Sequence, residues 1–586
     1  MVHMHLYDGI KAGCYDKNLN GAVRMEYIIF AVVMAGLVLT FLLKGYYDFR
    51  KSEKQFAQSL YTDYGILPQR EYSPVQFENI SHYFLKHTDG FHIDDITWND
   101  LNMDEIFKKM NFTYSAAGEE YLYYMLRCPC MDERELGRRE EIIRYFAEHS
   151  SERVAYQLIF HRLGRMGKFS IYDYLDYLDN LGMRSNIPHY MSLALLLASV
   201  ALMFIQLPLG LVAFFGILAY NNVNYFKEKE KIDPYIVSFS YVFRLLDAVK
   251  EIKAGRASVL EEELAILKMS STSMGSFKHG SFLVMSGNRM SGSGNPLDML
   301  LDYLRMGFHL DLIKFNQMLS EVRKHIKDID QMITVAGRIE AMIAVGAYRA
   351  SLQEYCVPEF VKENSIDTKD MYHPLIKEPV KNDMYTNASV LITGSNASGK
   401  STFLKTMAVN SILAQTIHTC LAKHYKSALF RIASSMSLRD DVQGGDSYYM
   451  VEIKAIKRIL DLCKEEGAPV LCFVDEVLRG TNTVERIAAS SQILLSLSGN
   501  NCMCFAATHD IELTHLLEEI YRNYHFTEEI QKDDISFTYK IIEGRAASRN
   551  AIRLLGIMGY DSSIIQKAEK MAADFSAVGV WPGTAR

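Results

Sequence analysis

A stretch near residue 400 has the residue types and spacing that hold phosphate groups. Residues 394–401 read Gly-Ser-Asn-Ala-Ser-Gly-Lys-Ser, the pattern G-x-x-x-x-G-K-S. The apolar run 389–393 before it predicts a strand, and the proline-free run 402–417, apolar on one face, predicts a helix. A strand that ends in a glycine-rich turn and reopens as a helix points backbone N–H groups at a triphosphate. The sequence therefore predicts a nucleotide-binding loop.

The predicted nucleotide contacts are the whole loop and the residue after it. They are Gly394, Ser395, Asn396, Ala397, Ser398, Gly399, Lys400, Ser401 and Thr402. In such a loop the Lys400 ammonium group reaches the β- and γ-phosphate oxygens, and the Ser401 hydroxyl ligates Mg²⁺.

Two further predicted strands end in side chains that hydrolysis needs. The apolar run 468–474 ends in Asp475 and Glu476, and the run 502–507 leads to His509. We expect Asp475 to hold Mg²⁺ through water and Glu476 to orient and deprotonate the attacking water. His509 is expected near the γ-phosphate. The predicted catalytic residues are thus Lys400, Glu476 and His509, and the predicted Mg²⁺ ligands are Ser401 and Asp475.

A serine between these elements has two interpretations. Ser447 precedes a helical run at 453–463. A serine at the start of a helix can donate its hydroxyl and backbone N–H to an anion, or it can simply cap the helix. The spacing alone does not choose between these roles.

The composition is that of a folded protein with several domains. The chain has 586 residues, 49% hydrophobic and 23% charged residues, and a formal net charge of -7. The negative balance argues against a protein that is basic over its whole surface, although a local basic patch would still attract nucleic acid. The nine cysteines are scattered without a histidine-rich partner segment, which argues against a zinc site.

Two uncharged apolar regions predict membrane segments. The run Tyr27–Leu43 is just long enough to span a bilayer, and no small-residue cleavage site follows it, so we interpret it as an uncleaved anchor. The region 191–220 is apolar with a Pro/Gly break at 206–210, which predicts a helical hairpin of two short spans or a re-entrant loop. Buried core helices are the alternative, but both runs are longer than most core helices.

The charges around these regions predict the orientation. Basic residues such as Lys44, Arg50 and Lys51 follow the first run and place the next region inside. A hairpin returns the chain to the side that it left, so residues 44–188 and 226–586 share one compartment. We therefore expect a multi-pass protein of the cell membrane whose ATPase domain is cytoplasmic.

The order of the motifs resembles a known family. The series T-G-S-N-A-S-G-K-S-T, D-D, S-Y-Y-M-V-E, F-V-D-E-V-L-R-G-T-N-T and A-T-H is similar to the ATPase domain of the MutS family of ABC-class mismatch-repair ATPases. The likeness extends over residues 93–575 and is strongest over 372–510. It implies ATP as the nucleotide, Mg²⁺ as the metal and an α + α/β fold. Together with the apolar regions, it predicts a helical lever/core domain with transmembrane segments, followed by a C-terminal P-loop ABC-type ATPase domain.

The resemblance and the two apolar regions together predict the order of domains. These are an N-terminal tail (1–26), a transmembrane helix (27–43), a linker (44–92), a MutS-like helical core/lever domain (93–360) interrupted by a transmembrane hairpin (189–224), a MutS-like ABC ATPase domain (361–575) and a C-terminal tail (576–586).

The resemblance implies a homodimer. Two ATPase domains face each other in the family, so Ser447 would contact the γ-phosphate bound to the opposite subunit. No segment resembles the family's mismatch-reading N-terminal domain. In addition, Pro379 stands where the family has an aromatic residue thought to stack on adenine, and Glu485-Arg486 replaces an acidic-Gly pair.

Two functions remain open at this point. In the first, a membrane-anchored MutS-like ATPase couples ATP hydrolysis to binding of mismatched, branched or nonspecific DNA. In the second, an ATP-driven clamp acts without DNA on the lipid bilayer, met through residues 27–43 and 189–224, or on a protein partner that the sequence does not identify. The acidic balance weighs against the first function, and a hairpin inside the lever region favours the second.

Overall fold

The computed structural model describes most of the chain. The described residues are 33, 36, 39–41, 43–165, 170–173, 176, 182, 184–255, 257–275, 277, 284, 306–395, 398–436, 448–479, 481–499, 501–531, 534–546, 552, 555, 559–578 and 581. Asn396, Ala397, Ser447 and much of the first predicted membrane segment lie outside them. The chain forms two compact units, Met1–Tyr64 and Gly65–Arg586, and in the first unit residues 43–62 are helical.

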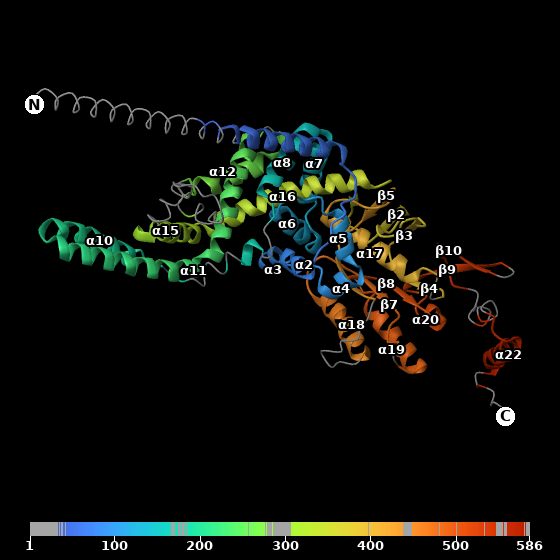
Figure 1. The fold of residues 1–586 in the computed structure, drawn as a ribbon. Coiled ribbons are helices and arrows are strands. Elements are labelled where there is room, and N and C mark those ends of the chain that lie inside the picture. The colour runs from blue at the N-terminus through green and yellow to red at the C-terminus, as the bar shows by residue number, and fades with distance from the viewer. Residues whose placement is uncertain are drawn as a thin grey trace, which may run out of the picture. The chain divides into compact units, whose positions relative to one another are not determined.

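The first part of the second unit is helical (Figure 1). Its helices are α2 (Pro74–Ile80), α3 (His82–Lys86), α4 (Asp95–Asp100), α5 (Met103–Met110), α6 (Ala116–Arg127), α7 (Glu133–Glu148), α8 (Ser150–Leu163), α10 (Ile187–Ile205), α11 (Leu207–Ala254), α12 (Glu261–Thr272), α15 (Leu310–Lys324) and α16 (Ile326–Ser351), with a 3₁₀ turn η1 (Ser258–Leu260).

Helices α6 and α16 pack closely at the centre of this part. A Cβ atom on Gly337 of α16 would lie 2.4 Å from the carbonyl oxygen of Ala117 in α6, so the contact requires glycine. The buried carboxyl group of Glu340 in α16 accepts hydrogen bonds from the backbone N–H groups of Tyr114 at 2.5 Å and Ser115 at 3.0 Å. Glu340 thereby satisfies donors at the start of α6, although burial raises its pKa to about 7.

Helix α6 begins later than the periodicity predicts. The apolar pattern predicts a helix from Asn111, whereas α6 starts at Ala116. Ser115 caps it, because its Oγ accepts a hydrogen bond from the Gly118 N–H at 3.1 Å. The buried Asn111 side chain instead donates to Glu119 of α6 at 2.6 Å and accepts the Thr113 hydroxyl at 2.6 Å, a local competition that periodicity does not reveal.

The apolar region after α8 forms a helical hairpin. The chain turns at Gln206 between α10 and α11, and Pro208 lies in the first turn of α11. A Cβ on Gly210 would lie 2.5 Å from the Met203 backbone nitrogen, so glycine allows the two helices to approach at the turn. Among the residues that the structure describes, Ile187–Ile205 and Leu207–Ile232 are long and apolar enough to cross a membrane.

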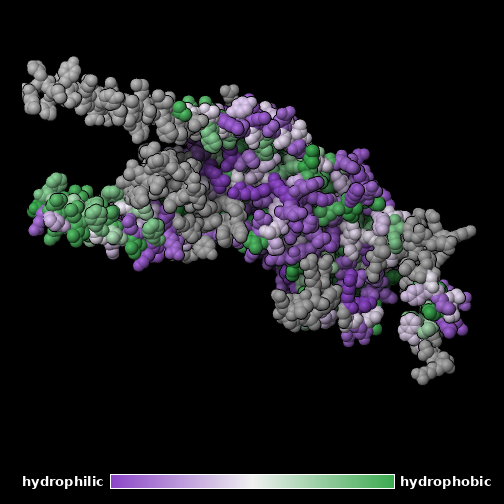
Figure 2. Space-filling view, viewed as in Figure 1, coloured by the Kyte–Doolittle hydropathy of each residue, from purple (hydrophilic) through white to green (hydrophobic). Residues whose placement is uncertain are grey.

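These two helices pack against each other but are otherwise largely exposed. Only 17% of the first apolar window and 11% of the second are buried in the protein. Figure 2 shows hydrophobic residues gathered along this hairpin. A core helix of a soluble protein would be mostly buried, so the hairpin presents an apolar surface that needs another environment.

Helix α11 is longer than the apolar segment. The charged run 226–262 predicts a long helix, and its first part continues α11 as one helix of 48 residues that ends at Ala254. The chain leaves the helix at Gly255, where a Cβ would lie 2.5 Å from the Tyr156 hydroxyl oxygen. The predicted helix was therefore too long at its C-terminal end, and α12 follows separately.

The second part of this unit contains two sheets. Its strands are β1 (Glu359–Phe360), β2 (Ile366–Met371), β3 (Asn382–Thr386), β4 (Ser389–Thr393), β5 (His424–Ser427), β6 (Arg431–Ser435), β7 (Val470–Asp475), β8 (Cys502–Thr508), β9 (Tyr521–Gln531) and β10 (Asp534–Glu543). Its helices are α17 (Lys400–Thr416), α18 (Tyr448–Lys464), α19 (Thr483–Ser496), α20 (Ile511–Leu516) and α22 (Ser562–Val578).

The larger sheet has helices on both faces. Its order is β10-β9-β4-β8-β7-β6, and its strands are parallel except for β10 against β9. Val390 and Ile392 of β4 share a core with residues of α17, whereas Leu391 shares one with residues of α18 and α19. Alternate residues of a strand point to opposite faces, so both faces of β4 are covered.

The architecture agrees with the predicted combination of a helical part and an α/β part. Two features were not predicted. The alternation of strands and helices from Ser389 onward predicts a parallel sheet, whereas the β9–β10 hairpin adds an antiparallel strand to it. A second sheet of order β1-β5-β2-β3 is built from three strands before β4 and one strand after α17.

Candidate functional site

The carboxyl ends of three strands meet at one edge of the larger sheet. Strand β8 lies between β4 and β7, and the register pairs Thr393 with Thr508 and Asp475 with Ala507. The loops after these strands therefore begin at the same level. Parallel α/β sheets bind their ligands at this edge.

Two glycines shape the loop after β4. Gly394 and Gly399 have φ angles of +149° and +103°, which favour glycine. A Cβ on Gly399 would also lie 3.1 Å from the Tyr539 ring. Between the glycines, Ser398 donates its hydroxyl and its N–H to the Ser395 carbonyl oxygen, at 2.8 Å and 3.2 Å. The loop thus has a fixed turn, which residues larger than glycine at positions 394 and 399 would disturb.

Lys400 is the first residue of α17 and is only 2% exposed. Its Nζ donates hydrogen bonds to the carbonyl oxygens of Gly394 at 2.7 Å and Ser395 at 2.8 Å, and it lies 3.4 Å from Nε2 of His509. A phosphate oxygen is a stronger partner for an ammonium group than a carbonyl oxygen is. The Lys400 ammonium group is therefore placed to exchange its hydrogen bonds to the loop carbonyl oxygens for bonds to phosphate oxygens.

Ser401 and Asp475 meet where a metal ion would lie. The Ser401 hydroxyl donates a hydrogen bond to Oδ2 of Asp475 at 2.5 Å. In the described part of the chain, the buried Oδ1 of Asp475 has no hydrogen-bond partner. Burial raises the pKa of Asp475, although the bond from Ser401 partly opposes this. A hydroxyl and an under-paired carboxylate are oxygen ligands of the kind that Mg²⁺ prefers, so these residues fit the ion.

Glu476 faces His509 beside the phosphate loop. Its Oε1 lies 2.6 Å from Nε2 of His509, and its Oε2 pairs with Arg479. Burial opposes ionisation, but the bond from His509 and the nearby positive charges outweigh it and hold the pKa of Glu476 below its ordinary value. The carboxylate is thus ionised at neutral pH, in the form that can accept a proton from water.

Two charged residues hold the loops after β7 and β8 in place. Oε1 of Glu452 in α18 accepts the backbone N–H of Leu478 in the turn after β7. Arg486 of α19 donates to both carboxylate oxygens of Asp510, at 2.9 Å and 2.6 Å, next to His509. Neither role was predicted, since each contact joins segments more than twenty residues apart. In the sequence, the opposite charges of Arg486 and Asp510 were the feature from which their contact could have been predicted.

A cavity of about 200 Å³ lies beside the phosphate loop. Gly399, Thr402 and Phe403 line it on the side of α17, and Pro379, Phe526 and Tyr539 also line it. Pro379, the position that the resemblance relates to adenine stacking, thus lies beside the phosphate loop, and the two rings of the β9–β10 hairpin, which were not predicted, supply aromatic surface there. The cavity has the position and the apolar lining for the base of a nucleotide.

Asn382 fixes this wall of the cavity. Its Nδ2 donates to the Tyr539 carbonyl oxygen and its Oδ1 accepts the Ile541 N–H, both at 3.0 Å. Tyr539 has φ +51° within an irregular stretch of β10, so a side-chain clamp is needed to keep its backbone there.

The structure brings five of the predicted residues to one place, namely Lys400, Ser401, Asp475, Glu476 and His509. Thr402 is directed to the neighbouring cavity. Asn396, Ala397 and Ser447 lie outside the described residues, and their roles stay predictions.

His373, also in the lining of this cavity, leads to a pH prediction. Burial lowers its pKa to about 4, with repulsion from Lys405 and Lys109 adding to the effect. The unfolded chain binds this proton near pH 6.5, so the stabilising contribution is complete above pH 6.5 and is lost as the pH falls towards 4. Between pH 7 and pH 5 we therefore expect protonation of His373 in the unfolded chain to lower the free energy of unfolding by about 2 kcal/mol.

The measurement is the thermal unfolding of the wild type and of His373→Asn at both pH values. The loss of Tm from pH 7 to pH 5 should be smaller in the variant, because asparagine does not titrate. Equal losses would show that His373 is not held in its neutral form.

Comparisons with known proteins agree on one family. Residues 390–576 match the model of MutS domain V. The chain is similar to MutS protein homolog 4 of Mus musculus, 31% identical over 297 residues, which are 47% of this chain and 30% of that protein. It is also similar to the DNA mismatch repair protein MutS of Lachnoclostridium phytofermentans, 26% identical over 46% of this chain and 30% of that protein, and of Thermotoga petrophila, 30% identical over 43% and 33%.

The similarity is concentrated in the part of the chain that holds the site. The matches span about a third of the length of these relatives. The residues that meet at the sheet edge all lie within the matched domain. Residues 390–576, which hold the site, are therefore a MutS domain V of the MutS family.

Proposed function

We propose that this protein is a membrane-anchored MutS-like ATPase that binds and hydrolyses ATP with Mg²⁺ and couples hydrolysis to DNA binding. The observation that carries the proposal is the convergence of Lys400, Ser401, Asp475, Glu476 and His509 at the ends of β4, β7 and β8. MutS relatives of this chain include proteins named for DNA mismatch repair.

Each residue has a defined task in hydrolysis. Lys400 and the loop N–H groups hold the phosphates, and Ser401 and Asp475 would hold Mg²⁺, which neutralises charge on the β- and γ-phosphate oxygens. Glu476 is the ionised group that orients the water and takes its proton. His509 pairs with Glu476 here and lies near Lys400, so binding of a γ-phosphate between them would break that pair and release the base.

The proposal includes a homodimer, in which Ser447 completes the site of the other subunit. If so, specific ATPase activity should rise with protein concentration. An inactive Lys400→Ala chain mixed with an inactive Ser447→Ala chain should regain activity, because half of the sites in a mixed dimer then contain both residues. Activity that is independent of concentration and no recovery on mixing would contradict assembly in trans.

Membrane anchorage is supported by the exposed apolar faces of α10 and α11. The proposed location is the cell membrane with the ATPase domain in the cytoplasm. Protein expressed without detergent should stay in the membrane pellet after an alkaline wash, which removes peripheral proteins. Release by that wash would contradict anchorage.

A second function is favoured by the path of α11. This helix runs unbroken from the hairpin turn to the core, about 72 Å at 1.5 Å per residue, and packs against α8, α12 and α16. Helix α16 packs on α6, and α6 packs on α17, which begins at Lys400. Movement at the phosphate loop could thus reach the hairpin through packed helices, as an ATP-driven clamp on the bilayer or on a protein partner would require.

DNA-dependent ATPase activity distinguishes the two functions. The full chain in mild detergent is assayed with duplex, mispaired and branched DNA, and gel shifts are run at 50 and 200 mM salt. The DNA function predicts stimulated hydrolysis and binding that weakens steeply with salt. No binding to any of these DNAs at low salt, with stimulation by lipid vesicles instead, would overturn it in favour of the clamp.

A further inference from the structure

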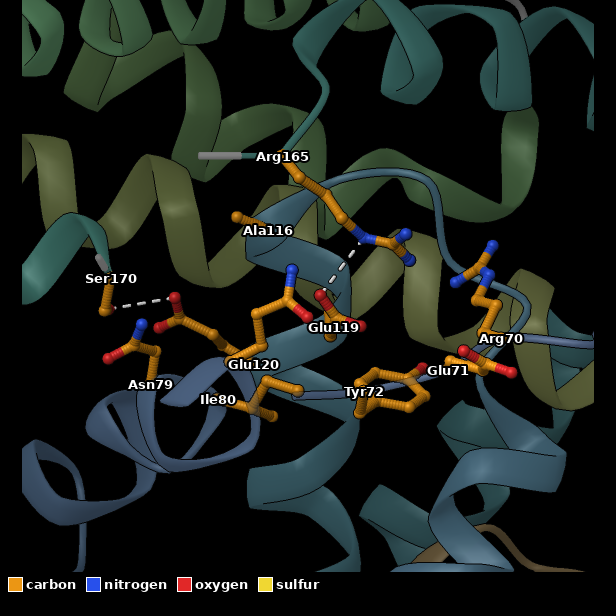
Figure 3. A pocket seen from close by; sticks show the side chains of 11 residues that line it. Arg70, Glu71, Tyr72, Asn79, Ile80, Ala116, Glu119, Glu120, Arg165 and Ser170 are labelled. Atoms are coloured by element: carbon orange, nitrogen blue, oxygen red, sulfur yellow. Dashed lines mark hydrogen bonds and ion pairs between the residues drawn. The ribbon is translucent and has the colours of Figure 1, made fainter. Parts of the chain in front are cut away.

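A second cavity, of about 290 Å³, lies among the helices (Figure 3). It shares no lining residue with the cavity beside the phosphate loop. Its walls come from the segment before α2, from α2 itself, from the first turn of α6 and from the chain after α8. Its lining is rich in charge, with both signs present.

Two of these charges satisfy each other. Nε of Arg165 lies 3.1 Å from Oε2 of Glu119, and Figure 3 shows this pair across the upper part of the cavity. Oε1 of Glu119 accepts a hydrogen bond from Asn111 at 2.6 Å. Neither carboxylate oxygen of Glu119 therefore lacks a partner.

One carboxylate oxygen of Glu120, the next residue of α6, lacks a hydrogen-bond partner in the described residues. It is 4% exposed, and its Oε1 accepts a hydrogen bond from the Ser170 hydroxyl at 2.9 Å. Oε2 is buried and has no hydrogen-bond partner in the described ranges. Burial raises the pKa of Glu120, and repulsion from Glu119 and Asp173 adds to the rise. The site thus lacks a positive charge or a donor at this oxygen.

Arg70 has a buried donor that lacks an acceptor in the described residues. Its Nη1 is buried and has no hydrogen-bond partner within the part of the chain that the structure describes. Burial lowers the pKa of Arg70, and the neighbouring Arg165 lowers it further. In Figure 3 Arg70 lies on the side of the cavity opposite Glu120, and within the described residues no ion pair joins the two.

We propose that this cavity binds a small zwitterion of the amino-carboxylate class, whose carboxylate pairs with Arg70 and whose ammonium group pairs with Glu120. A buried charge without a partner is costly, and a ligand with only one charge would leave the other residue unpaired. The volume equals that of about ten water molecules at roughly 30 Å³ each, which is room for a small molecule. Tyr72 and Ile80 in the lining offer apolar surface to its carbon chain.

The test is thermal unfolding of the full chain in mild detergent, without nucleotide. The probes are glycine, 4-aminobutyrate, 6-aminohexanoate and lysine at 10 mM, with hexanoate and hexylamine as probes of one charge each. At least one amino-carboxylate should raise the Tm by about 2 °C or more, as a ligand that binds only the folded state does. Hexanoate and hexylamine should not.

Matched variants show where the ligand binds. Glu120→Gln and Arg70→Gln should each abolish the rise in Tm, while Glu78→Gln, an exposed position of α2 outside the cavity, should keep it. Arg70 lies in a loop segment, so that variant tests the site even if Glu120→Gln does not fold. The proposal is overturned if no amino-carboxylate raises the Tm, if hexanoate or hexylamine raises it equally, or if the rise persists in the folded variants.

Discussion

Glu476→Gln should slow ATP hydrolysis by at least about a hundredfold while leaving ATP bound, because the substitution removes a general base without changing its shape. The structure gives the reason. The hydrogen bond from His509 and the nearby positive charges keep Glu476 ionised despite its partial burial. Glutamine has an amide in place of the carboxylate, so it cannot take a proton from water at neutral pH.

The measurement is single-turnover hydrolysis with filter retention of labelled ATP. Slow turnover with stable ATP retention is expected for the loss of a base. A matched control is Glu466→Gln, the same chemical change at an exposed turn after α18, which should hydrolyse ATP normally. Unchanged hydrolysis in Glu476→Gln would remove this residue from the role of base.

Strand ends are the part of the site that the sequence predicts well. Asp475, Glu476 and His509 each follow a buried apolar run, and parallel strands bring their carboxyl ends to one edge. Local sequence also places the phosphate loop, because its glycines need unusual backbone angles. These features depend on neighbours in the chain.

Contacts between segments that lie far apart in the sequence were not predicted. Tyr539 and Phe526 reach the cavity only because β9 pairs with β4, and Glu452 meets the turn after β7 only in the folded domain. Strand β2 is largely polar, with the sequence IDTKDM, so its pairing with β3 and β5 left no apolar pattern to read.

The predicted helices show a similar limit at their ends. Periodicity located α6 and α11, whereas a capping bond at Ser115 and a close approach at Gly255 set where α6 begins and α11 ends. Single hydrogen bonds and contacts of this kind leave little trace in an apolar pattern.

Lys400→Ala should weaken ATP binding at least about tenfold. A hydrogen bond to a charged group contributes about 1.5–3 kcal/mol, and a loss of 1.4 kcal/mol is a tenfold change in affinity. The Lys400 ammonium group is held at the loop by two carbonyl oxygens, 2.7 Å and 2.8 Å away, so it is already positioned where the phosphates would lie. Titration with a fluorescent ATP analogue measures the change.

The length of the phosphate chain separates lost phosphate contacts from a collapsed loop. Lys400 should act on the β- and γ-phosphates, so binding of AMP, which has neither, should be nearly unchanged, because its base still has the cavity lined by Phe526 and Tyr539. Lys423→Ala, which removes an exposed lysine beyond α17, should bind both nucleotides normally. Equal losses for ATP and AMP in Lys400→Ala would mean that the loop itself had failed, and normal ATP affinity would contradict the assignment of Lys400 to the phosphates.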